Sequence, residues 1–260
     1  MRLLVKIGGT LLDSPESRAR LARELAGAAR DGAEMVVVHG GGKQMTRFLD
    51  ERGIESRFID GLRVTTPETL DAVLKVLAGS VNQELVAAFV EAGAPAVGLT
   101  GVDACLTEAE PMNPALGAVG RPVRANPELL ELLTGRGYLP VVACVAGDRQ
   151  GRIYNVNADQ MATALAAGFR AARLVYLTDV AGVLDAGRRL LPLLSAAEAG
   201  ELIRQGVASG GMQAKLNAAV EALRQGVAEV VIAPGAEPGV VARLLAGEGL
   251  GTRLVRERLP

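Results

Sequence analysis

Two glycine-rich segments near the N-terminus combine residue types that can bind an anion. One reads Lys6-Ile7-Gly8-Gly9-Thr10 and the other His39-Gly40-Gly41-Gly42-Lys43, and each follows a run of apolar residues. Paired glycines between a strand and a helix let backbone N–H groups approach a phosphate or carboxylate, and the helix N-terminus adds a favourable field. Since carboxyl ends of parallel strands share one edge of a sheet, both turns are expected to face one ligand.

Neither segment fits a standard nucleotide fingerprint. Gly42-Lys43 is followed by Gln44 instead of Ser or Thr, which excludes a Walker P-loop. The first turn lacks the GxGxxG pattern, which disfavours a dinucleotide-dependent oxidoreductase. His39 is the only histidine, so a histidine-rich metal site is excluded and a structural role at a strand end is expected. Each segment taken alone is also compatible with an ordinary tight turn.

Three later segments place polar or charged side chains where a ligand could use them. Arg63 lies in a half-apolar segment suited to bidentate capture of a carboxylate, although a surface ion pair is the commoner role of an arginine. Asp159 could cap a helix that starts near residue 158 or hold lysine ammonium groups, and Asn155 could hydrogen-bond a substrate. Lys215 follows the glycines of residues 209–211 in the first turns of a helix, where bound phosphate would compensate an otherwise unfavourable cation.

The elements that must position these residues alternate between short apolar runs and helical patterns. This alternation predicts an α/β fold, a three-layer sandwich with a central, mainly parallel sheet and helices on both faces. The expected strands are Leu3–Ile7, Met35–His39, Pro95–Thr100, Leu139–Val145, Leu174–Thr178 and Glu229–Ala233. Helix starts are expected at Ser14-Pro15, Thr66-Pro67, Asn126-Pro127 and Ser195. Residues 104–124 are expected to form hairpins or an excursion over the surface, and residues 179–191 a hairpin-like segment.

Composition narrows the class of protein. With 28 Lys+Arg against 29 Asp+Glu the net charge is -1, which argues against a nucleic-acid binder. No uninterrupted apolar run approaches the roughly 20 residues of a membrane helix, and the short apolar start is not a signal peptide. Cys105 and Cys144 form no CxxC motif, so a reducing cytoplasm is the simplest expectation. The sequence predicts a cytoplasmic enzyme without a membrane or nucleic-acid partner.

In this order the segments resemble the amino acid kinase family over essentially the whole chain. The resemblance rests on Lys6-Ile7-Gly8-Gly9, Val38-His39-Gly40-Gly41-Gly42, Asp60-Gly61-Leu62-Arg63-Val64-Thr65, Gly137-Tyr138-Leu139-Pro140-Val141-Val142, Asn155-Val156-Asn157-Ala158-Asp159-Gln160, Thr178-Asp179-Val180-Ala181-Gly182-Val183-Leu184 and Gly211-Met212 with Lys215.

The resemblance implies a phosphotransferase with a carboxylate acceptor. The segments around Arg63 and Asn155 indicate N-acetyl-L-glutamate, whose ATP-dependent phosphorylation to the acyl phosphate is the second step of arginine biosynthesis. Lys6 and Lys215 would stabilise the transferred phosphoryl group and Asp159 would orient both lysines. Gly41, Gly42, Arg63 and Asn155 would bind the acceptor. The nucleotide would be bound by Gly8, Gly9, Asp179, Val180, Gly182, Val183, Leu184, Val207, Ser209 and Met212, with Mg²⁺ carried on the ATP phosphates and no metal ligands from the chain.

The resemblance also implies an organisation and leaves alternatives. Residues 1–260 would form one domain with a soft boundary near residue 150, the first part for acceptor binding and dimerisation and the second for ATP. No helix precedes the strand at residue 3, which in this family favours a homodimer insensitive to arginine. Rival interpretations are a sibling kinase and a non-catalytic nucleotide-binding sensor. The sibling kinase would act on carrier-bound aminoadipate, or on free aspartate, glutamate or carbamate. A carrier-bound acceptor predicts a basic patch, for which Arg121 and Arg124 are the only hint; residues 108–121 have no assigned role.

Overall fold

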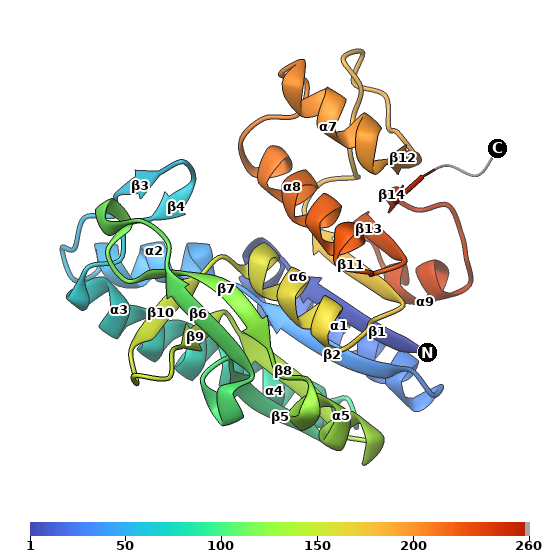
Figure 1. Ribbon diagram of the computed structural model, residues 1–260. Coiled ribbons are helices and arrows are strands. Elements are labelled where there is room, and N and C mark those ends of the chain that lie inside the picture. Colours follow the sequence, from blue (N-terminus) through green and yellow to red (C-terminus); the bar gives the residue numbers. More distant parts are fainter. Residues whose placement is uncertain (258–260) are drawn as a thin grey trace.

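An eight-stranded sheet runs through the computed structural model, which describes residues 1–257 (Figure 1). Its strand order is β12-β14-β13-β11-β1-β2-β8-β5. The strands from β13 to β5 are parallel, whereas β14 runs antiparallel to β13 and pairs in parallel with β12. Their bounds are β1 Arg2–Ile7, β2 Glu34–His39, β5 Ala96–Thr100, β8 Leu139–Ala143, β11 Arg173–Thr178, β12 Leu193–Ser195, β13 Glu229–Pro234 and β14 Thr252–Val255.

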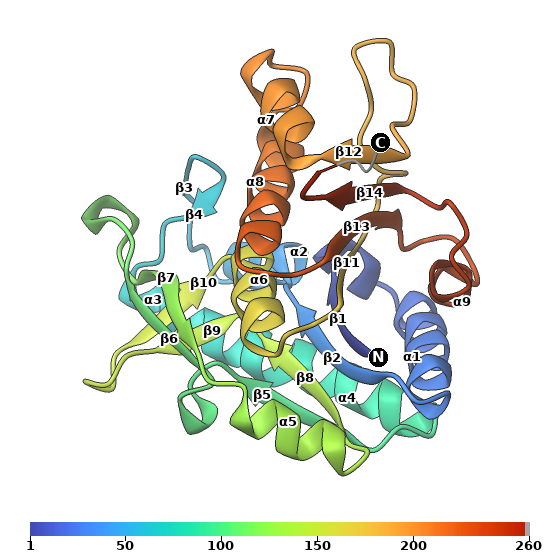
Figure 2. The same ribbon diagram turned by 45° about the vertical axis from the view of Figure 1, so that its right-hand side comes forward.

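Helices cover both faces of this sheet, which confirms the predicted three-layer α/β arrangement (Figures 1 and 2). One layer holds α1 Pro15–Arg30, α4 Asn82–Glu91 and α9 Val240–Leu245, and α4 continues from α3 Pro67–Val73 through π-helical turns over Leu74–Val81. The other layer holds α5 Glu128–Gly135, α6 Ala158–Gly168 and α8 Gly210–Arg224, with α7 Ala196–Arg204 packed on α8. Strands from both halves of the sequence therefore share one sheet, because β1 lies between β2 and β11.

Smaller elements surround the carboxyl edge of the sheet. The strands β6, β7, β9 and β10 form a small closed sheet. In it β6 pairs antiparallel with β7, which is the hairpin alternative for residues 104–124. A bridge between Leu184 and Leu190 makes the second predicted hairpin. The remaining elements are α2 Gly42–Asp50, β3 Phe58–Ile59, β4 Leu62–Arg63, β6 Thr107–Pro111, β7 Val119–Ala125, β9 Val145–Gly147, β10 Ile153–Val156 and short 3₁₀ turns over Gly9–Leu12, Asp103–Cys105 and Pro114–Leu116.

The predicted strand over residues 139–145 is wrong in one respect, since it is two strands. β8 ends at Ala143, and Val145 begins β9 in the small closed sheet. At the break the carbonyl of Cys144 accepts from Val156 N at 3.1 Å, and that of Val145 accepts from Gly101 N at 2.6 Å. The continuous apolar run cannot show this change of sheet, because both environments are buried. The other five predicted strands are confirmed to within one residue at each end.

Side-chain caps explain where the helices begin. Ser14 and Thr66 accept the backbone N–H three residues on, at 3.1 and 3.2 Å, and a proline opens each helix. Ser195 forms the predicted capping box with Glu198. The expected start at Asn126-Pro127 is one residue early: Pro127 takes the cap position and α5 begins at Glu128.

One helical stretch, Pro67–Glu91, is long and apolar enough to cross a membrane by length and composition alone. Core helices of globular proteins meet the same criterion. Within the fold α4 packs against α1 and the strands β5 and β8, so the stretch has a packing role in this structure and is weak support for a membrane span.

His39 is fully buried at the end of β2 and ties three elements together. Its Nδ1 lies 3.0 Å from the carbonyl of Gly40 and its Nε2 lies 3.0 Å from the amide nitrogen of Asn82, which also donates to Val141 O at 2.9 Å. Since a carbonyl only accepts, Nδ1 carries the proton and Nε2 accepts from Asn82. The predicted structural role of His39 is therefore confirmed. Burial lowers its pKa to about 4, so the imidazole is neutral at physiological pH.

This shift predicts a pH-dependent stability. Between about pH 6.5 and pH 4 the unfolded chain binds a proton at His39 that the folded chain does not, so the free energy of unfolding falls as pH falls, by about 3 kcal/mol in total. Urea denaturation of the wild type and of His39→Gln across this range measures the difference. The variant should lack this component of the slope, and parallel curves for the two proteins would contradict the prediction.

Candidate active site

The two glycine turns lie in contact beyond the carboxyl ends of β1 and β2. A Cβ atom on Gly9 would lie only 3.1 Å from the backbone nitrogen of Gly42 and 3.3 Å from the Cα of Gly41. Gln44 Nε2 joins the turns by donating to Gly9 O at 3.3 Å. Any side chain at Gly9 would force the turns apart, so glycine is needed for this close approach.

Lys6, Asp159 and Lys215 come together from three elements far apart in the sequence. Lys6 lies on β1, Asp159 in the first turn of α6 and Lys215 in the second turn of α8. The ammonium of Lys6 is 2.7 Å from Asp159 Oδ1, and that of Lys215 donates to Oδ2 at 3.1 Å. The lysine side chains are 9% and 19% exposed and the aspartate 7%. Both cations therefore share one buried carboxylate.

The start of α6 is capped by Asn157, which excludes the capping interpretation of Asp159. Asn157 Oδ1 accepts from the backbone N–H groups of Asp159 at 2.9 Å and Gln160 at 3.3 Å. The cap position just before the first helical residue suits an asparagine, whereas the first turn of α6 directs Asp159 toward the sheet. Because Asn157 satisfies the helix end, the carboxylate of Asp159 is free to pair with the lysines.

The three charges leave the cluster with a net charge of about +1. Burial alone would raise the pKa of Asp159, but the ammonium groups of Lys6 and then Lys215 outweigh it and hold that pKa below its usual range. The aspartate is therefore ionised at neutral pH and neutralises only one of the two lysines. A preorganised excess cation with little solvent around it is suited to stabilise an anion that develops additional charge.

A cavity of about 230 Å³, here called the inner cavity, opens beside this cluster. Its size suits a small organic acid. The side chain of Asn155 enters its wall from β10 and donates to Thr65 Oγ1 at 3.0 Å. Predicted site residues that line the cavity are Lys6, Gly9, Gly41, Gly42, Arg63 and Asn155.

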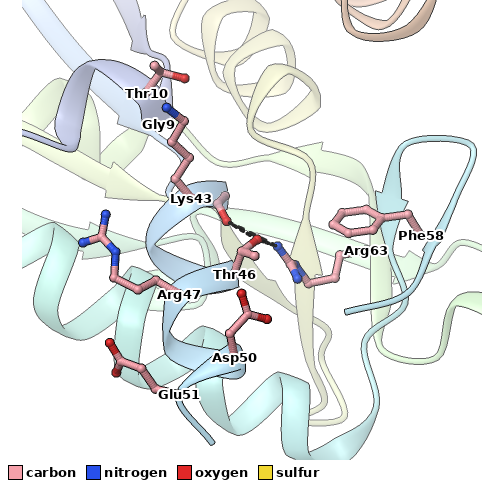
Figure 3. A pocket seen from close by; sticks show the side chains of 10 residues that line it. Gly9, Thr10, Lys43, Thr46, Arg47, Asp50, Glu51, Phe58 and Arg63 are labelled. Atoms are coloured by element: carbon pink, nitrogen blue, oxygen red, sulfur yellow. Dashed lines mark hydrogen bonds between the residues drawn. The ribbon is translucent and has the colours of Figure 1, made fainter. Parts of the chain in front are cut away.

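Arg63 lies on β4 at the boundary between the inner cavity and a wider opening of about 700 Å³, the outer groove (Figure 3). Its guanidinium donates to Thr46 Oγ1 at 2.7 Å, to Ser56 Oγ and to Gly42 O at 3.3 Å. Burial lowers the pKa of Arg63 and the charge of Asp50 opposes this, but a guanidinium stays protonated at any physiological pH. Within residues 1–257 no carboxylate forms an ion pair with it, so the surface-pair alternative does not describe Arg63.

Cys144 and Leu77 are among the residues of the inner cavity to which the sequence assigns no role. Cys144 lines the cavity, and burial raises the pKa of its thiol to about 11, so it is a neutral wall residue. Leu77 belongs to the π-helical turns and limits the space at Gly41, where a Cβ would lie 2.5 Å from Leu77 Cδ2. Sequence periodicity did not reveal Leu77, because the π-helical turns change which side chains face the cavity. The apolar surroundings of Cys144 were visible in the sequence, but its position beside Lys6 was not.

Apart from Gly9, which lines the inner cavity, the predicted nucleotide-binding residues lie outside it, mainly around β11 and α8. Gly8 connects the two regions by donating to Leu177 O at 2.9 Å. Val183 is 1% exposed, belongs to the hydrophobic core and donates its N–H to Thr252 Oγ1 at 2.8 Å, so its side chain faces the core and not a ligand surface. The buried Gly182 adjoins it. The predicted nucleotide-binding residues of this region that are exposed or partly exposed are Asp179, Val180, Leu184, Val207, Ser209 and Met212.

The sequence model of one family matches most of the chain. This model, described as the amino acid kinase family, matches residues 1–234. The chain belongs to the amino acid kinase family.

Relatives within this amino acid kinase family are similar over nearly the whole chain. The acetylglutamate kinase of Solibacter usitatus is 64% identical, over 98% of this chain and 99% of its own. The acetylglutamate kinase of Zymomonas mobilis is 42% identical, over 96% of this chain and 87% of its own.

Solved structures carry the same fold. An N-acetylglutamate synthase from Neisseria gonorrhoeae, complexed with coenzyme A and N-acetyl-glutamate, superimposes with a TM-score of 0.88 at 26% identity over 99% of this chain, which spans 60% of the synthase. A carbamate kinase from Giardia superimposes with a TM-score of 0.74 at 16% identity, over 98% of this chain and 99% of its own, which shows the amino acid kinase fold alone.

The charge cluster predicts a large stability effect at Asp159. Asp159→Asn keeps the side-chain shape but leaves two buried ammonium groups without their counter-charge, which should lower the free energy of unfolding by about 3 kcal/mol. Asp71→Asn is the matched control, because the pair of Asp71 with Lys75 is 61% exposed on both sides and should cost less than about 1 kcal/mol. Urea denaturation at pH 7 measures both. Equal effects of the two substitutions would contradict this account of the cluster.

Proposed function

We propose that this amino acid kinase transfers the γ-phosphoryl group of ATP to the side-chain carboxylate of N-acetyl-L-glutamate, giving the acyl phosphate in the second step of arginine biosynthesis. The observation that carries the proposal is the buried cluster of Lys6, Asp159 and Lys215 beside a cavity bordered by Arg63. The acetylglutamate kinases that are 64% and 42% identical to the chain support the choice of acceptor.

The cluster supplies what phosphoryl transfer requires, which is positioning and charge neutralisation. Lys6 and Lys215 stabilise the charge on the phosphoryl group in flight, and Asp159 holds both ammonium groups in place. The acceptor is a carboxylate that is already ionised at neutral pH, so no general base is needed. This agrees with the protonated state of Cys144 and with the burial of His39 behind the glycine turn.

The acceptor would lie in the inner cavity. Arg63 binds one carboxylate, Asn155 hydrogen-bonds the acceptor, and the backbone of Gly41 and Gly42 approaches it where a side chain would obstruct. The second carboxylate would then point toward Lys6. Both ends of a dicarboxylate are thus matched by separate cations, which distinguishes it from an acceptor with a single charge.

The nucleotide would lie on the part of the chain after residue 150, against the exposed residues near β11 and the start of α8. Gly8 and Gly9 approach its phosphates, while residues 1–150 carry most of the acceptor site. Lys6 and Lys215 would offset part of the negative charge of a triphosphate, and Mg²⁺ would be carried by the phosphates of ATP, with no ligand from the chain.

The assembly is a homodimer in the cytoplasm, with no membrane or nucleic-acid partner. Strand β5 supports the dimer, because it ends the large sheet and its five residues are all partly exposed. An edge strand of this kind offers unpaired backbone groups to a second chain. Val90 on the adjacent α4 adds an exposed apolar side chain to the same region.

A coupled assay for ADP release tests the function directly. The full chain is supplied with Mg²⁺, ATP and, in separate reactions, N-acetyl-L-glutamate, glutamate, aspartate, carbamate and aminoadipate. The expected result is turnover with N-acetyl-L-glutamate far above that with the others. Preference for another acceptor would identify a sibling kinase, and nucleotide binding without turnover on any of them would favour a sensor.

The lysines of the cluster should be needed for turnover. Lys6→Met and Lys215→Met each remove one charge that stabilises the transferred group, which should raise the barrier by about 3–4 kcal/mol and lower kcat roughly a hundredfold to a thousandfold. Lys75→Met, on an exposed helix surface, is the control and should keep the wild-type kcat. Thermal unfolding of each variant separates loss of fold from loss of chemistry. If a folded variant retained near-normal kcat, that lysine would have no catalytic role.

A further inference from the structure

We propose that Thr46, with Ser56 and Phe58, is a positioning residue that fixes the guanidinium of Arg63 for the acceptor carboxylate and keeps it away from Asp50. The inference rests on the proposed function for the identity of the acceptor. Thr46 lies on α2, Ser56 lies just before β3 and Phe58 lies on β3, so two separate parts of the chain hold one cation.

The hydroxyl of Thr46 has a fixed orientation. Its only proton is donated to Gly42 O at 3.0 Å, one helical turn earlier. The oxygen lone pairs are therefore available to Arg63, whose terminal nitrogen lies 2.7 Å away. The same nitrogen also approaches Gly42 O at 3.3 Å. Arg63 is thus bound to the N-terminal half of α2, next to the glycine turn that borders the inner cavity.

Phe58 and Ser56 hold the guanidinium from the hairpin side. Phe58 lies directly opposite Arg63 in the β3–β4 pair, and its ring centre is 4.7 Å from the guanidinium carbon. Phe58 is a large apolar residue that is 55% exposed, so it contributes little to the core. Its ring instead stacks on Arg63. Ser56 Oγ accepts from the other terminal nitrogen. Stacking and hydrogen bonding together restrict the plane of the guanidinium.

This restriction matters because Arg63 has two possible anionic partners. It lines both the inner cavity and the outer groove, and Asp50, one turn after Thr46 on α2, lines the outer groove as well (Figure 3). The charge of Asp50 acts on Arg63, yet in the described chain the two do not approach to ion-pair distance. Among residues 1–257 the Nε of Arg63 has no hydrogen-bond partner, so it is free to donate to an acceptor. Without Thr46 the guanidinium could turn to Asp50.

Steady-state kinetics of Thr46→Val and Thr46→Ser test this inference. Val keeps the shape and removes the hydroxyl, so KM for N-acetyl-L-glutamate should rise about tenfold while kcat and KM for ATP change less than about twofold. Ser restores the hydroxyl and should restore KM. In Thr46→Val/Asp50→Asn the competing charge is gone and most of the acceptor affinity should return. An unchanged acceptor KM in Thr46→Val, or an equal rise in KM for ATP, would overturn the inference.

A second measurement does not depend on the acceptor. Labelling by phenylglyoxal, followed by peptide mass spectrometry, reports how accessible the Arg63 guanidinium is in the full chain. Thr46→Val/Asp50→Asn, in which no Asp50 carboxylate can pair with the released guanidinium, and Phe58→Leu should label Arg63 several times faster than the wild type, with the exposed Arg136 as an internal reference. Equal rates would refute the positioning role. If the wild type does not phosphorylate N-acetyl-L-glutamate but the variants label faster, the proposed function fails and the positioning role stands.

Discussion

One carboxylate shared by two ammonium groups is the interaction on which the rest of the site depends. Asp159 on α6 pairs with Lys6 on β1 and with Lys215 on α8. It therefore connects the first strand of the chain to two helices from the second half of the sequence. Desolvation makes each buried charge costly, so the three are stable only together. The packing of α6 against β1 and α8 is what keeps them together, and the chemistry of the site therefore depends on the contacts between these elements.

The second constraint is the close approach of the two glycine turns. A Cβ on Gly9 would meet the backbone of Gly41 and Gly42, and a Cβ on Gly41 would meet Leu77 of the π-helical turns. Backbone groups can border a small cavity only if no side chain occupies the space, so glycine has a different use here from its common use in a left-handed turn. His39 Nδ1 donates a hydrogen bond to the carbonyl oxygen of Gly40 and so fixes the same turn from the core side. The glycine turn is thus fixed on one side by the core and open to the cavity on the other.

The sequence could predict much of the fold and less of the site. The strands and the helix caps can be predicted from the sequence, because apolar runs and a Ser or Thr before a proline act locally, as at Ser14 and Thr66. The change of sheet at Cys144 was not, since a strand buried in either sheet has the same composition. The sequence leaves open whether Asp159 caps α6 or holds the lysines, and Asn157 provides the cap. Both residues are good caps, and only the tertiary contact with the lysines distinguishes them. Thr46 was missed because its partner is 17 residues away on another element.

The fold cannot by itself decide the reaction. A synthase complexed with coenzyme A and N-acetyl-glutamate, and a carbamate kinase, share this architecture at TM-scores of 0.88 and 0.74. What separates reactions on one scaffold is the placement of a few charges. In a chain with a net charge of -1, the cations of the site have to be concentrated locally. Arg63 and Lys6 both line the inner cavity. In the proposed function it is these two cations, more than the sheet beneath them, that would select an acceptor with two carboxylates.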